Sequence, residues 1–161
     1  MKFCRFNDDD GNPVYGVLED TVIYELSDSP FASYEGVAIR KTSQRWRLED
    51  VKLLAPCTPS KIVAIGLNYK AHAAEQHLEP PAAPLLFAKA PNVVIGPDEP
   101  IRMPVGLSEQ VDYEAELAVV IGLPGFRIHR TDAFKHVFGY TIVTDVTARA
   151  LQRGDKQWFR G

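Results

Sequence analysis

Cysteine is scarce in this chain, and so is any surplus of charge. The 161 residues include two cysteines, Cys4 and Cys57, in no C-x-x-C arrangement, so the sequence offers neither a structural zinc site nor a disulfide framework. Lysine and arginine total 18 against 21 aspartates and glutamates, which leaves a net charge of −3. Such a weak field argues against nucleic acid or an anionic membrane as a partner.

Long apolar runs are also missing. The first residues, MKFCRFNDDDG, lead into an acidic cluster without an apolar core of signal-peptide length, and no later segment approaches the length of a membrane-spanning helix. The segment IVAIGLN contains Gly66 without the G-x-G-x-x-G spacing of a dinucleotide-binding turn. We therefore expect a cytoplasmic protein without a nucleotide-binding fold.

Short strands separated by turns dominate what is present. The segments KFCRF, VYGVLE and TVIYEL are rich in β-branched and aromatic residues and are separated by polar turns. They predict a small N-terminal β domain over residues 1–58, because Pro56 and Pro59 interrupt regular structure at its end. Residues 59–161 would form a second domain that begins with the buried strand KIVAIG. The fold class expected is β-rich α+β.

Helices are few in this interpretation. Seven of the twelve prolines lie between residues 80 and 104, so that segment should be extended, with LLFAKA and NVVIG as its short strands. The segments KAHAAE and ARALQRGD each suit a short helix. The segment TDAFKHVFG predicts a two-turn helix that begins at Thr131 or Asp132 and ends at Gly139, and YTIVTDVTAR predicts a strand after it.

One predicted strand has three acids on one face. In VDYEAELAVVIG, residues 111–122, alternate side chains share a face, so Asp112, Glu114 and Glu116 lie on the same side. A solvated strand face is the simpler explanation. However, both faces become apolar from Leu117 onward, and like charges near buried positions repel unless a cation lies among them. A hard divalent ion would neutralise them.

Asp145 could complete such a site. It interrupts the apolar, β-branched segment YTIVTDVTAR, where it would either cap the following turn or join Glu114 and Glu116 as a third ligand. Three carboxylates with one oxygen each would leave about three octahedral positions for water or substrate, the open geometry that a catalytic Mg²⁺ or Mn²⁺ site needs.

A second group of interest lies in GLNYKAHAAE. If KAHAAE is helical, His72 and Glu75 lie on one face, where the carboxylate can orient the imidazole as a general base. The alternative is an ordinary pair of surface residues. His77 would lie on a different face from His72, and for His129 and His136 we prefer the surface interpretation.

Four segments, in their order along the chain, resemble the fumarylacetoacetate hydrolase family. They are IVAIGLNYKAHAAE, PLLFAKAPNVVIGP, VDYEAELAVVIG and GYTIVTDVTARALQ. The resemblance covers about residues 61–161, and the N-terminal third is similar to the small β domain of many bacterial members. It implies that residues 59–161 form part of a mixed β-sandwich roll, the catalytic fold of that family.

The resemblance also implies roles for the acids and for the histidine. The metal ligands of the family correspond to Glu114, Glu116 and Asp145, which would bind Mg²⁺ or Mn²⁺, with Ca²⁺ as a substitute in crystals. The base dyad of the family, on a lid-like element, corresponds to His72 and Glu75.

The substrate-facing positions of the family are matched by Arg149 and Gln152, and Lys89 matches the lysine of its F-x-K segment. Ala150 departs from the family pattern, which often has an acid after the arginine. The family also usually places a catalytic lysine just beyond the position of Gly161, the last residue here. We therefore expect a fragment of a longer protein or a truncated homologue.

The function implied is metal-dependent hydrolysis of a C–C bond in a 2,4-dioxo acid of the acylpyruvate or fumarylpyruvate type, within aromatic compound catabolism. The metal would stabilise the departing enolate. The same chemistry would serve an oxaloacetate decarboxylase, or an isomerase of 5-carboxymethyl-2-hydroxymuconate or 2-hydroxyhepta-2,4-diene-1,7-dioate. A non-catalytic β module is the alternative of another class. The expected partners are a small 2-oxo acid and a second copy of the chain in a homodimer. A chain without the closing strands would expose strand edges and an incomplete core, so it should dimerise, aggregate or remain partly unfolded.

Overall fold

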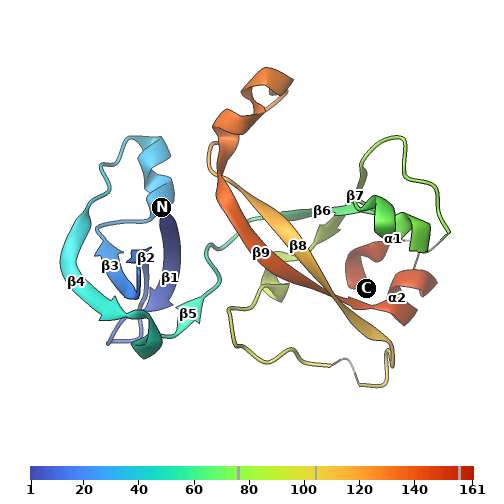
Figure 1. Ribbon diagram of the computed structural model, residues 1–161, viewed down its shortest axis with the longest axis horizontal. Helices are drawn as coiled ribbons and strands as arrows, with labels where there is room; N and C mark the ends of the chain where they lie inside the picture. Colours follow the sequence, from blue (N-terminus) through green and yellow to red (C-terminus); the bar gives the residue numbers. More distant parts are fainter. Residues whose placement is uncertain (76, 104, 156) are drawn as a thin grey trace. The chain divides into compact units, whose positions relative to one another are not determined.

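The computed structural model describes residues 1–75, 77–103, 105–155 and 157–161. In these residues, nine strands alternate with two short α-helices and several 3₁₀ turns, which confirms the β-rich α+β class (Figure 1). No helix in this part of the chain is long and apolar enough to cross a membrane.

The chain divides into two compact units. Unit 1 comprises Met1–Cys57, Ile95–Glu99 and Ala115–Thr144, and unit 2 comprises Thr58–Val94, Pro100–Glu114 and Asp145–Gly161. Because unit 1 takes in later segments as well as the N-terminal residues, the two domains expected from the sequence stay a prediction.

A five-stranded antiparallel sheet forms the N-terminal part of unit 1, in the order β4-β3-β2-β1-β5 (Figure 1). Its strands are β1 (Lys2–Asn7), β2 (Pro13–Glu19), β3 (Val22–Leu26), β4 (Lys41–Arg47) and β5 (Leu53–Leu54). The first three confirm the strands expected from the sequence. Strand β4 escapes sequence analysis because KTSQRWR is polar and lies at an edge, where only Thr42 and Trp46 are half-buried.

Phe6 and Ile23 form the centre of the core of this sheet, and both side chains are fully buried. The Phe6 ring meets the Trp46 ring edge-on, with centroids 5.1 Å apart. Gly16 on β2 makes this packing possible, because a β-carbon there would overlap Cγ2 of Ile23 and lie 3.0 Å from a Phe6 ring carbon. The glycine is therefore needed for space rather than for an unusual backbone angle.

The long strands β8 (Val111–Ile121) and β9 (Val137–Ala148) pair with each other (Figure 1). The predicted helix from residue 131 to Gly139 is wrong. A 3₁₀ turn, η4 (Arg130–His136), begins one residue earlier, and β9 has already started at Val137. The Phe138 ring packs against Phe31, with centroids 4.5 Å apart, so this contact favours the extended backbone over another helical turn.

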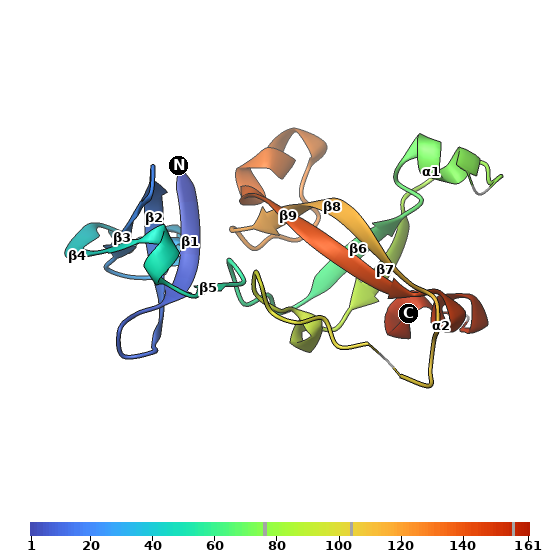
Figure 2. The same cartoon turned by 60° about the horizontal axis from the view of Figure 1, so that its bottom comes forward.

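In unit 2, β6 (Ile62–Gly66) pairs antiparallel with β7 (Leu85–Lys89). The two expected helices are confirmed as α1 (Lys70–Glu75) and α2 (Arg149–Gly154), and Figure 2 shows α2 following directly from β9. The expected strand at NVVIG is wrong, because Pro91–Val93 form a 3₁₀ turn, η3, with the proline at its start.

The side chains packed in unit 2 are small or aromatic. Ala64, Ala73 and Ala148 are buried there. The Trp158 ring, in the 3₁₀ turn η5 (Trp158–Arg160), meets Phe87 edge-on at 5.4 Å. It also covers Gly66, where a β-carbon would lie only 2.5 Å from a Trp158 ring carbon.

We expect Gly16→Ala to destabilise the protein, because the new methyl group would have to displace the buried Ile23 side chain. Overpacking of this kind costs about 1–3 kcal/mol of unfolding free energy, measurable by urea denaturation. Gly139→Ala is the matched control, since a β-carbon at this other strand glycine meets nothing within 4 Å. Equal effects of the two substitutions would contradict the packing argument.

Candidate metal and substrate site

Two of the three acids of strand β8 are partly covered. Glu114 and Glu116 are half-buried and Asp112 is 56% exposed, whereas Tyr113 and Leu117 on the other face are 83% and 63% exposed. A solvated acidic face would show the opposite pattern, with the apolar side chains covered and the acids in water. The burial of this strand therefore argues against that simpler explanation.

Arg149, the first residue of α2, binds two of these acids. Its Nε donates to Oδ2 of Asp112 at 2.7 Å, and its Nη2 donates to Oε1 of Glu114 at 2.6 Å. Its Nη1 donates to Oε1 of Gln152, one turn along the helix, at 2.9 Å. The backbone N–H of Arg149 also donates to the Gln110 carbonyl at 2.8 Å. These contacts fix the start of α2 against the start of β8.

The surroundings of Arg149 favour its charged form. Burial lowers the pKa of the guanidinium, but the hydrogen bonds and charges of Asp112 and Glu114 outweigh that effect and hold the pKa above its usual value. Ala150, where the family often has an acid, is exposed. Arg149 is therefore held in place by Asp112 and Glu114 without an acid at position 150.

Lys89, the last residue of β7, pairs with Asp145 of β9. The Nζ and Oδ1 atoms are 2.6 Å apart, and the side chains are 18% and 8% exposed. The Lys89 ammonium also lies 5.6 Å from the centroid of the Phe87 ring. A buried carboxylate needs a cationic or hydrogen-bonding partner, and Lys89 supplies it.

Two of the three predicted metal ligands, Glu114 and Asp145, are thus paired with cations of the chain itself. Among the described residues, no three His, Cys, Asp or Glu side chains are grouped closely enough to hold a metal ion. Glu114 binds Arg149 and Asp145 binds Lys89. Hard carboxylate oxygens that already bind positive charge fit Mg²⁺ or Mn²⁺ chemically, and the ligand set with Glu116 stays a prediction.

The predicted base dyad lies on α1. His72 Nδ1 and Glu75 Oε2 are 3.8 Å apart, with side chains 35% and 81% exposed. This distance allows an ion pair but exceeds that of a hydrogen bond, so the carboxylate orients the imidazole only loosely. The role of the pair as a base stays a prediction.

Two of the other histidines have structural roles that their sequence spacing did not indicate. His129 precedes η4, and its Nδ1 accepts a hydrogen bond from the Thr131 backbone N–H at 3.4 Å. His136 Nδ1 lies 2.9 Å from the Leu123 carbonyl oxygen. His77 is exposed, with a left-handed backbone angle.

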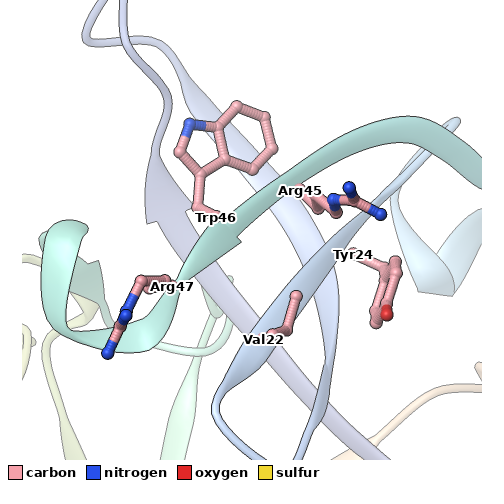
Figure 3. Close-up of a pocket in the computed structure, with 5 residues that line it drawn as sticks. All are labelled: Val22, Tyr24, Arg45, Trp46 and Arg47. Atoms are coloured by element: carbon pink, nitrogen blue, oxygen red, sulfur yellow. The ribbon is translucent and has the colours of Figure 1, made fainter.

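A hollow on the N-terminal sheet lies on β3 and β4 (Figure 3). It is lined by Val22, Tyr24, Arg45, Trp46 and Arg47. Two of its polar groups already have partners, because the Trp46 indole donates to Asp9 at 2.9 Å and Arg47 pairs with Glu49. None of the predicted site residues lines it, so we do not assign it a function.

Two known protein families match this sequence, one in its N-terminal third and one in the remainder. Residues 61–161 match the family described as fumarylacetoacetate (FAA) hydrolase C-terminal, and residues 1–56 match the family described as Rv2993c-like, N-terminal. This chain belongs to the fumarylacetoacetate hydrolase family. The resemblance seen in the four sequence segments is therefore confirmed.

Curated relatives of this fumarylacetoacetate hydrolase family protein are matched over only part of their length. Protein Rv2993c of Mycobacterium tuberculosis is 45% identical over 136 residues, 84% of this chain and 49% of the relative. Oxaloacetate tautomerase YisK of Bacillus subtilis is 49% identical over 120 residues, 72% of this chain and 40% of the relative. The chain thus spans about half, or less, of the length of these curated relatives.

A solved structure supports the fold. The crystal structure of 5-carboxymethyl-2-hydroxymuconate delta-isomerase from Mycobacterium smegmatis superposes with a TM-score of 0.84 at 38% identity, over 99% of this chain and 60% of that one. The β-rich arrangement is therefore that of the fumarylacetoacetate hydrolase fold, as the sequence segments indicated.

We expect Glu116→Ala to weaken the binding of Mn²⁺ or Mg²⁺ at least tenfold, or about 1.4 kcal/mol, because it removes one of three carboxylate ligands. Isothermal titration of the purified chain measures this directly. Glu109→Ala is the control, since it removes one exposed negative charge just before β8. If both variants bind the ion as the unmodified chain does, the metal site does not include Glu116.

Proposed function

We propose that this chain catalyses the keto–enol tautomerisation of a small 2-oxo dicarboxylic acid such as oxaloacetate, with a divalent ion held by Glu114, Glu116 and Asp145. One observation supports this most strongly, namely that Arg149 of α2 pairs with Asp112 and Glu114 of β8 and that Lys89 of β7 pairs with Asp145 of β9. The relative YisK, named an oxaloacetate tautomerase, supports the choice of substrate class.

The residues of the chain divide the chemistry among them. A bound Mg²⁺ or Mn²⁺ would supply positive charge to the oxygens of an enolate. Arg149 and Lys89 are suited to bind the carboxylates of the substrate, because a guanidinium or an ammonium forms strong hydrogen bonds with such groups. These two side chains would also orient the substrate for proton transfer.

His72 would act as the base in this proposal. Its Nδ1 lies 3.8 Å from Oε2 of Glu75, and a ring nitrogen of the imidazole would accept the proton from carbon 3 of the oxo acid. The C–H electron pair then forms the C2–C3 double bond, and the carbonyl oxygen takes up a proton to give the enol. The negative charge of Glu75 would stabilise the imidazolium formed in between.

Hydrolysis of a C–C bond in a 2,4-dioxo acid is the second proposal, favoured by the hydrolase family to which residues 61–161 belong. His72 would then take a proton from water, the oxygen would add to the distal carbonyl, and the broken C–C bond would leave its electron pair on a pyruvate enolate. Isomerisation of a hydroxymuconate-type acid, after the name of the Mycobacterium smegmatis relative, needs the same enolate.

The expected homodimer is a further part of this proposal. It is supported by the exposed apolar side chains of β8, Leu117, Val119 and Ile121, because such a stripe favours association in water.

We expect His72→Ala to slow tautomerisation of oxaloacetate, or hydrolysis of an acylpyruvate, by about 10²- to 10⁴-fold, since it removes the general base. The affinity for Mn²⁺ should stay unchanged, because the imidazole is not a metal ligand. Decarboxylation of oxaloacetate needs no attacking water and should survive in part. Following the enol absorbance and the release of pyruvate separates these reactions.

His77→Ala is the control for this variant, because it removes an exposed imidazole from the same segment. Small and equal losses on all substrates in the two variants would make His72 an ordinary surface residue. Comparing the unmodified chain on oxaloacetate and on acylpyruvate decides between the tautomerase and the hydrolase.

A further inference from the structure

We propose that Arg149 and Lys89 are internal counter-ions of the site, and that a divalent ion displaces the Arg149 guanidinium from Oε1 of Glu114 and the Lys89 ammonium from Oδ1 of Asp145. The inference rests on the proposed function, because it concerns how the same site is loaded. Arg149 and Lys89 would then control metal binding. The family resemblance alone relates Arg149 to substrate contacts and Lys89 to the lysine of the F-x-K segment.

Glu114 and Asp145 each make a short contact with a cationic side chain. Oε1 of Glu114 accepts Nη2 of Arg149 at 2.6 Å, and Oδ1 of Asp145 lies 2.6 Å from Nζ of Lys89. Arg149 is 12% exposed, and Asp145 is 8% exposed. Solvent screens such pairs little, so they are stronger than pairs on an open surface.

A divalent ion would compete with the Arg149 guanidinium and the Lys89 ammonium for the same carboxylate oxygens, because all three carry positive charge. A divalent ion prefers the same carboxylate oxygens as the guanidinium and the ammonium. If the ion and the cationic side chain approached the same oxygen together, their like charges would repel at short range and with weak screening. The ion and the cationic side chain therefore compete for Oε1 of Glu114 and for Oδ1 of Asp145.

Asp112 makes this exchange feasible for Arg149. Its Oδ2 accepts Nε of the same guanidinium at 2.7 Å, and its side chain is 56% exposed. Asp112 is not among the predicted metal ligands, so Arg149 can keep this partner and the Gln152 amide while it releases Glu114. The Nη2 group would then be available to an anionic substrate.

The test is the affinity of the 161-residue chain for Mn²⁺, measured by the loss of the free-ion signal in electron paramagnetic resonance. We expect Arg149→Met to bind Mn²⁺ at least fivefold more tightly than the unmodified chain, because Glu114 no longer has an internal cation. Arg153→Met is the matched control, since it removes the same charge from the same helix, where Nη1 of Arg153 donates to Oε1 of Gln110 at 3.0 Å.

A residue that merely positions Glu114 would give the opposite result. If Arg149→Met binds Mn²⁺ no more tightly than Arg153→Met, or more weakly than the unmodified chain, the counter-ion proposal is wrong. Lys89→Met applies the same test to Asp145, with the same expected direction, if Arg149→Met does not fold.

Thermal denaturation supplies a readout that does not depend on activity. In EDTA, Arg149→Met should melt at a lower temperature than Arg153→Met, because Glu114 is left unpaired, and saturating Mn²⁺ should remove most of that difference. An equal difference in both conditions would show that the ion does not replace the guanidinium, and it would overturn the proposal.

The outcomes for the proposed function remain distinguishable. If the unmodified chain binds no Mn²⁺, or if Glu116→Ala leaves the affinity unchanged, the metal-dependent function fails together with this inference. If Mn²⁺ binds through Glu116 but Arg149→Met does not tighten it, only the counter-ion role is wrong.

Discussion

The interaction on which the candidate site depends is the pairing of the Arg149 guanidinium with two carboxylates of β8. It joins the first residues of β8 to the first turn of α2 through Asp112, Glu114 and Gln152. Charge-assisted hydrogen bonds of this type contribute about 1.5–3 kcal/mol each. The buried apolar side chains described in unit 2, Ala64, Ala73 and Ala148, are all small, so these ionic contacts supplement a small apolar core.

Much of the local structure could be predicted because it depends on neighbours in the sequence. The alternation in residues 111–121 predicts β8, and the short apolar run before Gly66 predicts β6. The failures come from contacts between distant residues. Phe138 continues β9 because it packs on Phe31, and β4 is held at the sheet edge by pairing rather than by its own apolar pattern.

The same division explains what could be predicted of the site. The three acids of β8 and the isolated Asp145 are visible as residues that break an apolar pattern. Their pairing with Arg149 and Lys89 is not, because Lys89 reaches Asp145 from a strand far earlier in the chain. Only the fold brings Arg149 to Glu114 and Lys89 to Asp145, and the spacing of residues in the sequence does not predict contacts between distant segments.

The exposed Asp112 adds to an excess of negative charge among these residues. Arg149 and Lys89 pair with Asp112, Glu114 and Asp145, and Glu116, the third proposed ligand, adds a fourth carboxylate, so two negative charges are left over. A divalent ion bound by the proposed ligands would neutralise both. An oxo acid that carries two carboxylates would be repelled before the ion binds and not after it, so that metal would enter before substrate.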